Sequence, residues 1–409
     1  MGMRLPSSFQ DHFVTLTDPR CPYAPQSRHL LMDMLVIAVC AVISGAEGWE
    51  DLEEYGKAQA EWLADLLDFP HGLPGHDTFR RVFSQGDPEE FTQGFIAWTN
   101  ALHAATAGDI GAIDGTTLRH AFDRATATTA LHRVRAWASA HRVVLGQRKV
   151  EEKSNEMTAL PALLPRLDVA GAVVTMEAMG CQKAIAQTMV ERGAEYVLAL
   201  KEPPPTLSED VTLLLNDARD TGCTDVEHAY HATVDGDHGR METRRYWITS
   251  PIEWLGAQAS WAHLPSVGMV ESRREIGATV PIDTRYFLTA LPAQGIRFAQ
   301  AVRQHWGIEN ALPGVLDVAF NEDACRIRKD QGAQICAVLR HIALNLLRHE
   351  PHHKRGITAR RKRAGWDRDS LVQVLTGEPK CACPGASHGA CSAWCAGASK
   401  ALFEDHERR

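Results

Sequence analysis

The apolar positions in the first hundred residues recur at helical spacing. Between Leu30 and Leu67, apolar side chains return every three or four residues, and the stretch from Asp77 to Ala105 continues in the same manner. The positions that carry this pattern are Leu35, Ala38, Val42, Trp49, Leu52, Tyr55, Phe79, Val82, Phe83, Phe91, Phe95 and Trp98. The sequence therefore predicts a helical unit in this part of the chain.

Near Ala107 the pattern changes to short β-branched or aliphatic runs, each bounded by glycine or charge. Helix-like segments at Thr158–Leu167 and Gln182–Arg192 lie between the later runs. The predicted strands are Ile110–Ile113, Arg142–Val150, Ala172–Met176 and Tyr196–Leu200. Strands that alternate with helices in this way indicate a mixed α/β core.

A β-rich stretch follows Lys201, where the periodicity breaks at Pro203, Pro204 and Pro205. Further strands are predicted at Glu242–Thr249, Val267–Glu275 and Thr284–Thr289, and a helix is predicted at Arg297–Leu312. We interpret the β-rich stretch as an insertion between a core strand and the last core helix.

Bulk properties limit the possible partners of the chain. No apolar run reaches the roughly 18 residues of a membrane span, and the longest, Leu30–Ser44, is interrupted by Asp33. Residues 1–10 show no basic flank followed by an apolar stretch, so we expect a cytoplasmic protein that does not contact a membrane. The net charge of −8 and the pI near 6.2 predict that any nucleic-acid site is local.

The ten cysteines fall into two groups. Four crowd around His388 in Cys381-Ala-Cys383 and Cys391-Ser-Ala-Trp-Cys395, but their spacing matches no common zinc finger. We interpret this tail as an unrelated or read-through extension, with zinc binding as the alternative. The others show no repeated spacing, as expected of reduced thiols in a cytosolic chain, and are Cys21, Cys40, Cys181, Cys223, Cys325 and Cys336.

Three carboxylates stand where a metal site could form. Asp114 follows the run Ile110–Ile113 and Glu177 follows Val173–Met176, so both are predicted to project from the ends of core strands. Glu309 falls on the apolar face of its helix, where an unpaired charge is costly. Three such groups can hold two Mg²⁺ ions about 3.5–4 Å apart for phosphodiester displacement. Acids at strand ends are common, so spacing alone leaves a plain structural role open.

Several ordered motifs carry a family resemblance. From about Phe9 to Gly377, the chain resembles transposases of the H-repeat-associated insertion-sequence group, which use a DDE set of acids. The motifs are Ala41-Val-Ile-Ser-Gly-Ala-Glu-Gly-Trp49, Gly75-His-Asp-Thr-Phe-Arg-Arg-Val-Phe83, Ala112-Ile-Asp-Gly-Thr-Thr-Leu-Arg119, Val150-Glu-Glu-Lys-Ser-Asn-Glu156, Ala178-Met-Gly-Cys-Gln182, His238-Gly-Arg-Met-Glu242 and His305-Trp-Gly-Ile-Glu-Asn310.

The resemblance implies a domain order and an activity. A helical transposase-associated domain is expected at residues 9–100, and an RNase H-like catalytic domain at 107–348 with its β-rich insertion at about 202–295. A basic segment at 349–377 and a disordered Cys-rich tail at 378–409 would follow. The implied activity is Mg²⁺- or Mn²⁺-dependent DNA strand cleavage and transfer at insertion-sequence ends. The implied partners are terminal inverted repeats, target DNA and further copies of the chain in a synaptic complex.

The resemblance also implies the catalytic and metal-binding residues and shows where this chain departs. Asp114 matches the first acid and Glu309 the last, while Glu177 stands where the family has Asp. The extra methylene of Glu177 shifts a carboxylate in a site that demands near-octahedral geometry. Further departures from the family pattern are Asp114-Gly-Thr-Thr117, Lys201-Glu-Pro-Pro204 and Leu312-Pro-Gly314.

These departures leave two function classes open. Pro313 lacks the N–H that would bond to the carbonyl of Glu309, and a proline costs about 3 kcal/mol in a helix interior, so a kink is predicted there. One class is a working recombination enzyme. The other is a catalytically impaired remnant that only binds DNA.

Clustered Lys and Arg supply candidate DNA contacts, because they neutralise phosphates. Lys354-Arg355 and Arg360–Arg363 form a C-terminal basic cluster, for which a solvated face is the alternative. Arg244-Arg245 in the insertion is predicted either to hold a DNA end or to be an exposed pair of strand charges. His76–Arg81 is interpreted as an ordinary helix start rather than a DNA contact.

His305, four residues before Glu309, has two interpretations. It could touch the scissile phosphate or orient the acid, or it could be a core histidine satisfied by a hydrogen bond. Its neighbour Trp306 is interpreted as a packing residue. With the resemblance, the candidate DNA-binding residues are Arg119, Lys201, Arg240, Arg303, His305, Arg326 and Arg328.

Overall fold

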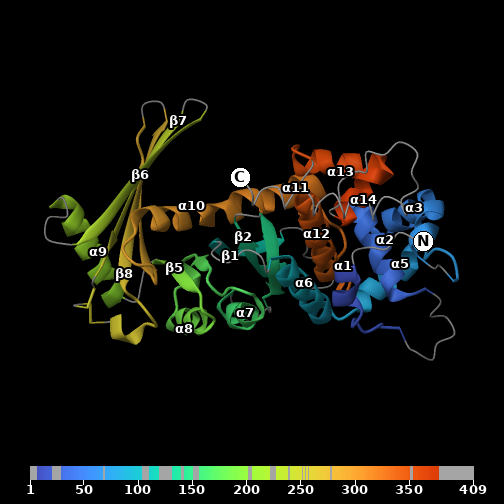
Figure 1. Cartoon of the computed structure of the whole chain (residues 1–409), viewed down its shortest axis with the longest axis horizontal. Helices are drawn as coiled ribbons and strands as arrows, with labels where there is room; N and C mark the ends of the chain where they lie inside the picture. The colour runs from blue at the N-terminus through green and yellow to red at the C-terminus, as the bar shows by residue number, and fades with distance from the viewer. Residues whose placement is uncertain are drawn as a thin grey trace, which may run out of the picture.

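The computed structural model describes residues 7–20, 29–67, 70–103, 110–118, 131–139, 142–150, 156–200, 205–221, 227–237, 240–250, 252–253, 255–256, 258–276, 279–350 and 353–376. A helical group lies at one end of the molecule and a long twisted sheet fills the rest (Figure 1). The fold is therefore mixed α/β with a helical N-terminal region, as the periodicity predicts.

The N-terminal helices form because their apolar positions share one face. Nearly every residue of the second helix is buried, including Asp33, the one charged residue in its otherwise apolar run. Gly45 ends that helix at φ 123°, a backbone conformation that L side chains rarely adopt. The helices are α1 (Ser7–Phe13), α2 (Leu31–Ser44), α3 (Trp49–Ala58), α4 (Ala60–Leu66), α5 (His76–Gln85) and α6 (Pro88–His103).

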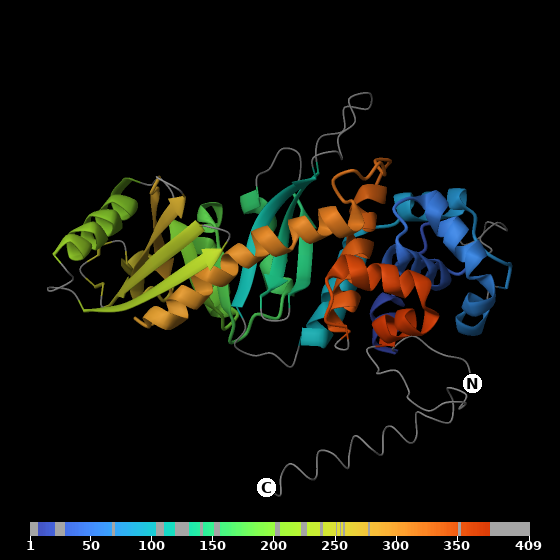
Figure 2. The same cartoon turned by 90° about the horizontal axis from the view of Figure 1, so that it is seen from above.

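Helices from the other end of the chain complete the core of this group. Figures 1 and 2 show α12 (Gly332–His349), α13 (Ile357–Trp366) and α14 (Arg368–Thr376) lying against the N-terminal helices. One apolar cluster contains Leu35 and Ile37 of α2 together with Leu339 of α12 and Leu371 of α14. The ranges 9–100, 107–348 and 349–377, which were expected to form separate parts, therefore each contribute helices to one core.

The sheet has nine strands in the order β3-β2-β1-β4-β5-β9-β8-β7-β6. β1 pairs antiparallel with β2 and parallel with β4, and β4 is parallel to β5. This first half has the RNase H-like arrangement that the resemblance implies. Its strands are β1 (Ile110–Leu118), β2 (Leu131–Ala138), β3 (Val143–Lys149), β4 (Val173–Met176) and β5 (Glu195–Leu200).

The β-rich part between β5 and the last core helix extends the same sheet. β9 pairs antiparallel with β5, so the expected insertion is continuous with the half of the sheet formed by β1 to β5. It also contains a helix, α9 (Pro205–Asp220), which begins at a proline where the sequence suggests only a break. Its strands are β6 (His228–Asp237), β7 (Arg240–Thr249), β8 (Ser266–Ile276) and β9 (Ile282–Thr289).

Helices cover both faces of the sheet. The α7 (Glu156–Leu163) and α8 (Lys183–Glu191) helices lie on one face, and α10 (Gly295–Ala311) runs across the other (Figures 1 and 2). The predicted kink is a full break, because α10 ends at Ala311 and α11 (Pro313–Phe320) begins at the proline itself. Proline suits this first helical position, since no N–H is needed there.

Among the described residues, no single helix is long and apolar enough to cross a membrane, although α2 and α3 reach that length and composition together with a bend of 94° between them.

Candidate active site

Asp114 and Glu177 border the same hollow. The parallel pairing of β1 with β4 ends at Ile113 opposite Met176, so each acid is the next residue on its own segment. A hollow of about 30 Å³ touches both residues, and its apolar walls belong to the core on the α7 face of the sheet. Its walls are formed by Ile113, Asp114, Gly115, Val134, Leu160, Met176, Glu177 and Gly180. The two acids are thus neighbours across adjacent strands.

The position of Asp114 corrects one expectation. The acid does not end its strand, because β1 continues to Leu118 and Asp114 pairs with Arg135 of β2. Side chains alternate along a strand, so Asp114 points to the same face as Ala112, the face that α10 covers. Antiparallel pairing on its other side therefore holds the backbone of Asp114 in place, which a strand end would not do.

Glu177 follows β4 directly, as predicted, and begins a tight turn. Its carbonyl accepts a hydrogen bond from the N–H of Gly180 at 2.9 Å, and the side chain of Glu177 is exposed. A Cβ at Gly180 would lie 2.8 Å from Sδ of Met176, so only glycine fits without a shift. The turn therefore fixes the backbone of Glu177 while leaving its carboxylate accessible.

The α10 helix brings the third predicted acid to the same face. Within α10, His305 packs on β4, where its Nδ1 lies 2.9 Å from Oγ1 of Thr175. Glu309 follows one helical turn later on α10. Its side chain lies outside the described part of the structure, so its role as the third acid stays a prediction.

The structure favours the core interpretation of His305. The side chain is 8% exposed and faces the sheet, and its Nε2 has no hydrogen-bond partner among the described residues. Burial lowers the pKa of His305 to about 4, although Glu177 and Thr175 act in the opposite direction. The imidazole is therefore neutral at neutral pH and does not face solvent.

The arginines around Trp306 are engaged within the protein. Arg244 is buried rather than exposed, bonds to Asp235 at 2.9 Å and lies 5.0 Å from the ring centroid of Trp306. Arg303, a predicted DNA contact, bonds to the same carboxylate at 2.6 Å. Arg245 is exposed and pairs with Glu271. The Arg303–Asp235 ion pair and the Arg244–Trp306 contact join α10 to the β6–β7 hairpin.

Other predicted DNA contacts divide into exposed and undescribed residues. Arg326, Arg328 and Lys329 are exposed in the loop between α11 and α12. Arg240 begins β7, but its side chain is not among those described. The remaining predictions lie outside the described residues and are Arg119, Lys201 and the Cys-rich tail at 378–409.

The C-terminal basic cluster is only partly a solvated face. Arg361 is buried, donates to the carbonyl of Val42 at 2.6 Å and lies 4.2 Å from the ring centroid of Phe320. Arg360 donates to the carbonyls of Leu347 and Glu350 near the end of α12. Lys354, Arg355 and Lys362 are exposed. The cluster thus combines two helix-packing arginines with four exposed cations, since Arg363 is exposed as well.

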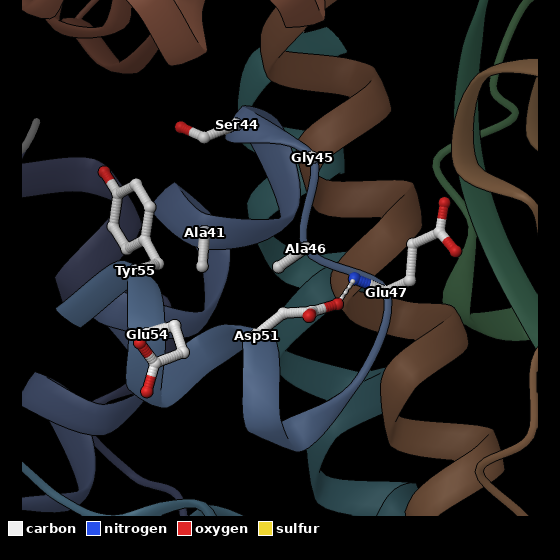
Figure 3. A pocket seen from close by; sticks show the side chains of 8 residues that line it. All are labelled: Ala41, Ser44, Gly45, Ala46, Glu47, Asp51, Glu54 and Tyr55. Carbon is white, nitrogen blue, oxygen red and sulfur yellow. Dashed lines mark hydrogen bonds between the residues drawn. The ribbon is translucent and has the colours of Figure 1, made fainter. Parts of the chain in front are cut away.

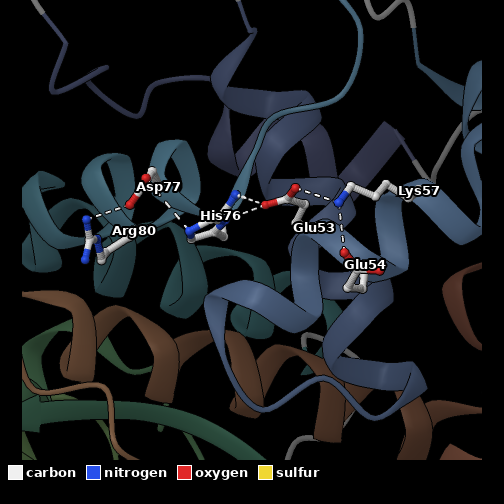
Figure 4. A network of polar contacts seen from close by, with 6 residues as sticks. All are labelled: Glu53, Glu54, Lys57, His76, Asp77 and Arg80. Atoms are coloured by element: carbon white, nitrogen blue, oxygen red, sulfur yellow. Dashed lines mark hydrogen bonds and ion pairs between the residues drawn. The ribbon is translucent and has the colours of Figure 1, made fainter.

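The residues His76–Arg81 form a helix start with its own ion network, as interpreted from the sequence. Glu53 accepts from both the backbone N–H and the ring Nδ1 of His76 at 2.6 Å, and Lys57 lies 2.7 Å from Glu53 (Figure 4). Arg80 bonds to Asp77 at 2.6 Å. The Lys57 and His76 contacts lower the pKa of Glu53 to about 2. This network joins α3 to α5.

A second hollow, of about 300 Å³, lies at the α2–α3 corner and is lined by acids (Figure 3). Asp51 accepts hydrogen bonds from the N–H groups of Glu47 and Gly48, and Glu54 is bonded by Lys57. Glu47 accepts from Asn321 at 3.0 Å. Each acid around this hollow therefore has a partner already, which argues against a cation site.

The carboxylates of Asp114 and Glu177, rather than the apolar walls of the hollow, are the groups that suit a hard divalent cation. Carboxylate oxygens are the ligands that Mg²⁺ and Mn²⁺ prefer, and Mg²⁺ keeps several waters beside one or two carboxylates. The hollow has room for one or two waters. Among the described side chains, no group of three metal-ligating residues comes together. A third ligand would have to come from Glu309 or from the substrate.

Family models match most of the chain. The model for the domain associated with DDE transposases matches residues 10–99, and the model for the transposase DDE domain matches residues 105–346. The chain belongs to the DDE transposase family. The "H repeat-associated putative transposase YhhI" of Escherichia coli (strain K12) is 37% identical over 356 residues, which cover 85% of this chain and 93% of the relative.

Other members and a solved transposase extend the comparison. The "Putative transposase YncI" of Escherichia coli O157:H7 is 37% identical over 358 residues, covering 85% of this chain and 90% of the relative. The cryo-EM structure of a piggyBac transposase synaptic complex with hairpin DNA covers 93% of this chain and 83% of its own, at 9% identity and a TM-score of 0.41. That superposition is too loose for residue-level comparison.

One buried polar network of this transposase was not predicted from the sequence. Glu322, just beyond α11, is buried against Arg133 and Arg135 of β2. The partners are 189 and 187 residues apart, and no motif or spacing signals such a pairing. The only local hint is that two arginines replace apolar residues at alternate positions of a core strand.

Proposed function

We propose that this transposase cleaves and joins DNA strands at the ends of an insertion sequence, with Asp114, Glu177 and Glu309 as its catalytic, metal-binding acids. The observation that carries the proposal is that Asp114 and Glu177 are the residues directly after Ile113 and Met176, where the pairing of the adjacent parallel strands β1 and β4 ends. The α10 helix, which contains position 309, packs on the face of the sheet to which Asp114 points. Family membership supports the same reaction class.

The chain's own residues would contribute positioning and ligands. Asp114, held between two paired strands, would offer a carboxylate with a fixed backbone, and Glu177 would offer an exposed carboxylate directly after β4. A divalent ion bound there supplies Lewis-acid stabilisation of the attacking and leaving oxygens of phosphodiester exchange. The exposed Arg326, Arg328 and Lys329 would bind phosphates of DNA entering that site.

We further propose that the DNA partners are terminal inverted repeats and target DNA, and that several copies act together on paired ends. Because the net charge is −8, DNA binding would depend on local cations such as Lys354, Arg355 and Lys362 beside the loop arginines. Affinity for an element end would then fall steeply with salt.

Cleavage of a labelled DNA fragment carrying the flanking element end, with Mg²⁺ or Mn²⁺, tests the proposal. The wild-type chain is expected to cut, and Glu309→Ala is expected to abolish cutting. Glu191→Asp, at an exposed position at the end of α8, is the control for Glu177→Asp and should leave the rate unchanged.

Two outcomes separate the open function classes. A wild-type chain that binds the end without cutting, and that cuts once Glu177 is replaced by Asp, would identify an impaired DNA-binding remnant. Cutting that persists in Glu309→Ala would show that the third acid is misassigned.

A further inference from the structure

Glu322 is a buried carboxylate held by two buried arginines. Its side chain is 5% exposed, and its oxygens accept from Nη2 of Arg135 at 2.6 Å and from Nη2 of Arg133 at 3.1 Å. Burial acts to raise the pKa of Glu322, but Arg135 and Arg133 outweigh it and hold the pKa far below its usual range. The two guanidinium groups therefore favour the ionised form of Glu322.

The arginine of the shorter bond stands next to the candidate active site. Arg135 of β2 lies directly opposite Asp114 of β1, and such cross-strand partners point to the same face with Cβ atoms about 4.5–5.5 Å apart. Arg133 also donates to Oε1 of Gln147 on β3 at 3.0 Å. Glu322 is thus bonded to the central strand of the part of the sheet that β1, β2 and β3 form.

Glu322 also marks the end of the segment that contains the last predicted acid. The α10 helix, the single linking residue Leu312 and α11 run without a loop from Glu309 to Phe320, and Glu322 follows two residues later. Its N–H bonds back to the carbonyl of Leu316 at 3.2 Å, which fixes it to α11. A displacement of Glu322 would therefore also displace α11 and α10.

The residue before it ties this turn to the helical group. Asn321 has φ 50°, a left-handed conformation that asparagine tolerates, and its amide donates to Oε2 of Glu47 between α2 and α3. The Asn321–Glu322 turn therefore joins three parts of the molecule, namely the helical group, the α10–α11 segment and the sheet beside Asp114.

A buried ion pair is a poor source of net stability, because desolvation offsets most of the attraction, whereas its geometry is strict. We infer that Glu322 is a positioning residue. Through its ion pair with Arg135, it holds Asp114 and the helix that contains Glu309 at a fixed separation. This role rests on the proposed function of the acids. If Glu322 has this role, the geometry of the metal site depends on a residue that does not bind the metal.

Manganese affinity of the full chain, measured by the electron paramagnetic resonance of free Mn²⁺, tests this role. Glu322→Gln is expected to weaken Mn²⁺ binding by about 10–100-fold, as removal of outer partners of metal ligands typically does. It should lower kcat for end cleavage while leaving KM for the DNA end unchanged. Glu322→Asp, which keeps the charge, should recover part of the affinity.

Glu89 supplies a matched control, because it is another carboxylate held by two arginines, Arg148 and Arg166, but away from β1. Glu89→Gln should change Mn²⁺ affinity by less than about twofold, as for other substitutions away from the site. If Glu322→Gln does not fold, Arg135→Gln removes the same contact from the other side while Arg133 keeps its bond to Glu322.

The outcomes are distinct. Glu322→Gln and Arg135→Gln proteins with wild-type Mn²⁺ affinity and kcat would overturn the positioning role and leave the proposed function intact. A wild-type chain that binds no Mn²⁺ would overturn the proposed function and this role with it. Equal losses in Glu322→Gln and Glu89→Gln would show a general structural effect and likewise overturn it.

Discussion

The side-chain amide of Asn345 hydrogen-bonds both backbone groups of Val144, accepting from its N–H at 2.9 Å and donating to its carbonyl at 2.8 Å. Val144 lies on β3, the outermost strand on that side of the sheet. A single asparagine on α12 therefore takes the place of a neighbouring strand, and it protects an edge that would otherwise offer unpaired backbone groups.

Replacement of Asn345 by Ala should destabilise the protein. It leaves a buried N–H and a buried carbonyl without partners, which costs roughly 1–3 kcal/mol for each group. We expect a loss of about 2–5 kcal/mol in the free energy of unfolding, measured by urea titration. Asn100→Ala is the control, since Asn100 also bonds two backbone groups but is only part-buried. Equal losses in the two variants would contradict the edge-protecting role.

Replacement of Gly180 by Ala should disturb the turn after Glu177. The added Cβ would meet Sδ of Met176 at 2.8 Å and its Cβ at 2.9 Å, so the turn must shift. We expect a destabilisation of about 1–3 kcal/mol by overpacking and a loss of metal-dependent cleavage. Gly314→Ala meets nothing within 4 Å in α11 and should stabilise by about 0.5–1 kcal/mol. Thermal melts that rank the two variants in the reverse order would refute this account.

The exposed pair His76–Glu53 should be sensitive to pH. The hydrogen bond to Glu53 raises the pKa of His76 above its ordinary value of 6.5. Because the folded pKa is the higher one, the contribution of this pair to stability is complete below pH 6.5 and is lost as pH rises through the folded pKa. An NMR titration of His76 should show the raised pKa, and Glu53→Gln should return it toward 6.5. Glu54→Gln, which contacts Lys57 but not His76, should leave it raised.

Substitutions of two adjacent cations of α13, Arg361 and Lys362, should have different effects, one on stability and the other on DNA binding. Arg361→Ala removes a buried bond to Val42 and a contact with Phe320, and should cost about 2–4 kcal/mol of stability without a specific effect on DNA. Lys362→Ala should change stability by less than about 0.5 kcal/mol. If Lys362 contacts a phosphate, its loss lowers the slope of log affinity against log salt by about one. An unchanged slope would assign Lys362 to the solvated face.

The pattern of apolar residues was sufficient to predict some helices and strands, because the residues that they bury are apolar. The α2 helix is an apolar run interrupted only by Asp33 before its terminal Ser44, and β4 is a buried four-residue strand, so both were predictable. The β2 strand was not, because Arg133 and Arg135 occupy positions on which the strand pattern expects apolar residues. In α9 the proline that suggests a break is in fact its first residue, where no N–H is needed.

The candidate site was predictable only in its local parts. Asp114 and Glu177 each follow a recognisable apolar run, but the continuation of β1 to Leu118 depends on pairing with β2, which the sequence did not reveal. Arg244 and Arg361 were expected at the surface because charge is normally solvated, whereas partners distant in the sequence allow both to be buried. Long-range polar pairing of this kind leaves no periodic trace.

The helical group built from α2 and α12 has a consequence for synthesis on the ribosome. The apolar face of α2 emerges early, yet Leu339 and its neighbours, which cover it, are made roughly 300 residues later. At about 5–20 residues per second, the nascent chain must keep that face from aggregating for about 15–60 s. A copy of the gene interrupted before α12 would encode a product that lacks α12, α13 and α14, so the part of α2 that they cover in the full chain would stay exposed, and we expect such a fragment to aggregate or to be degraded.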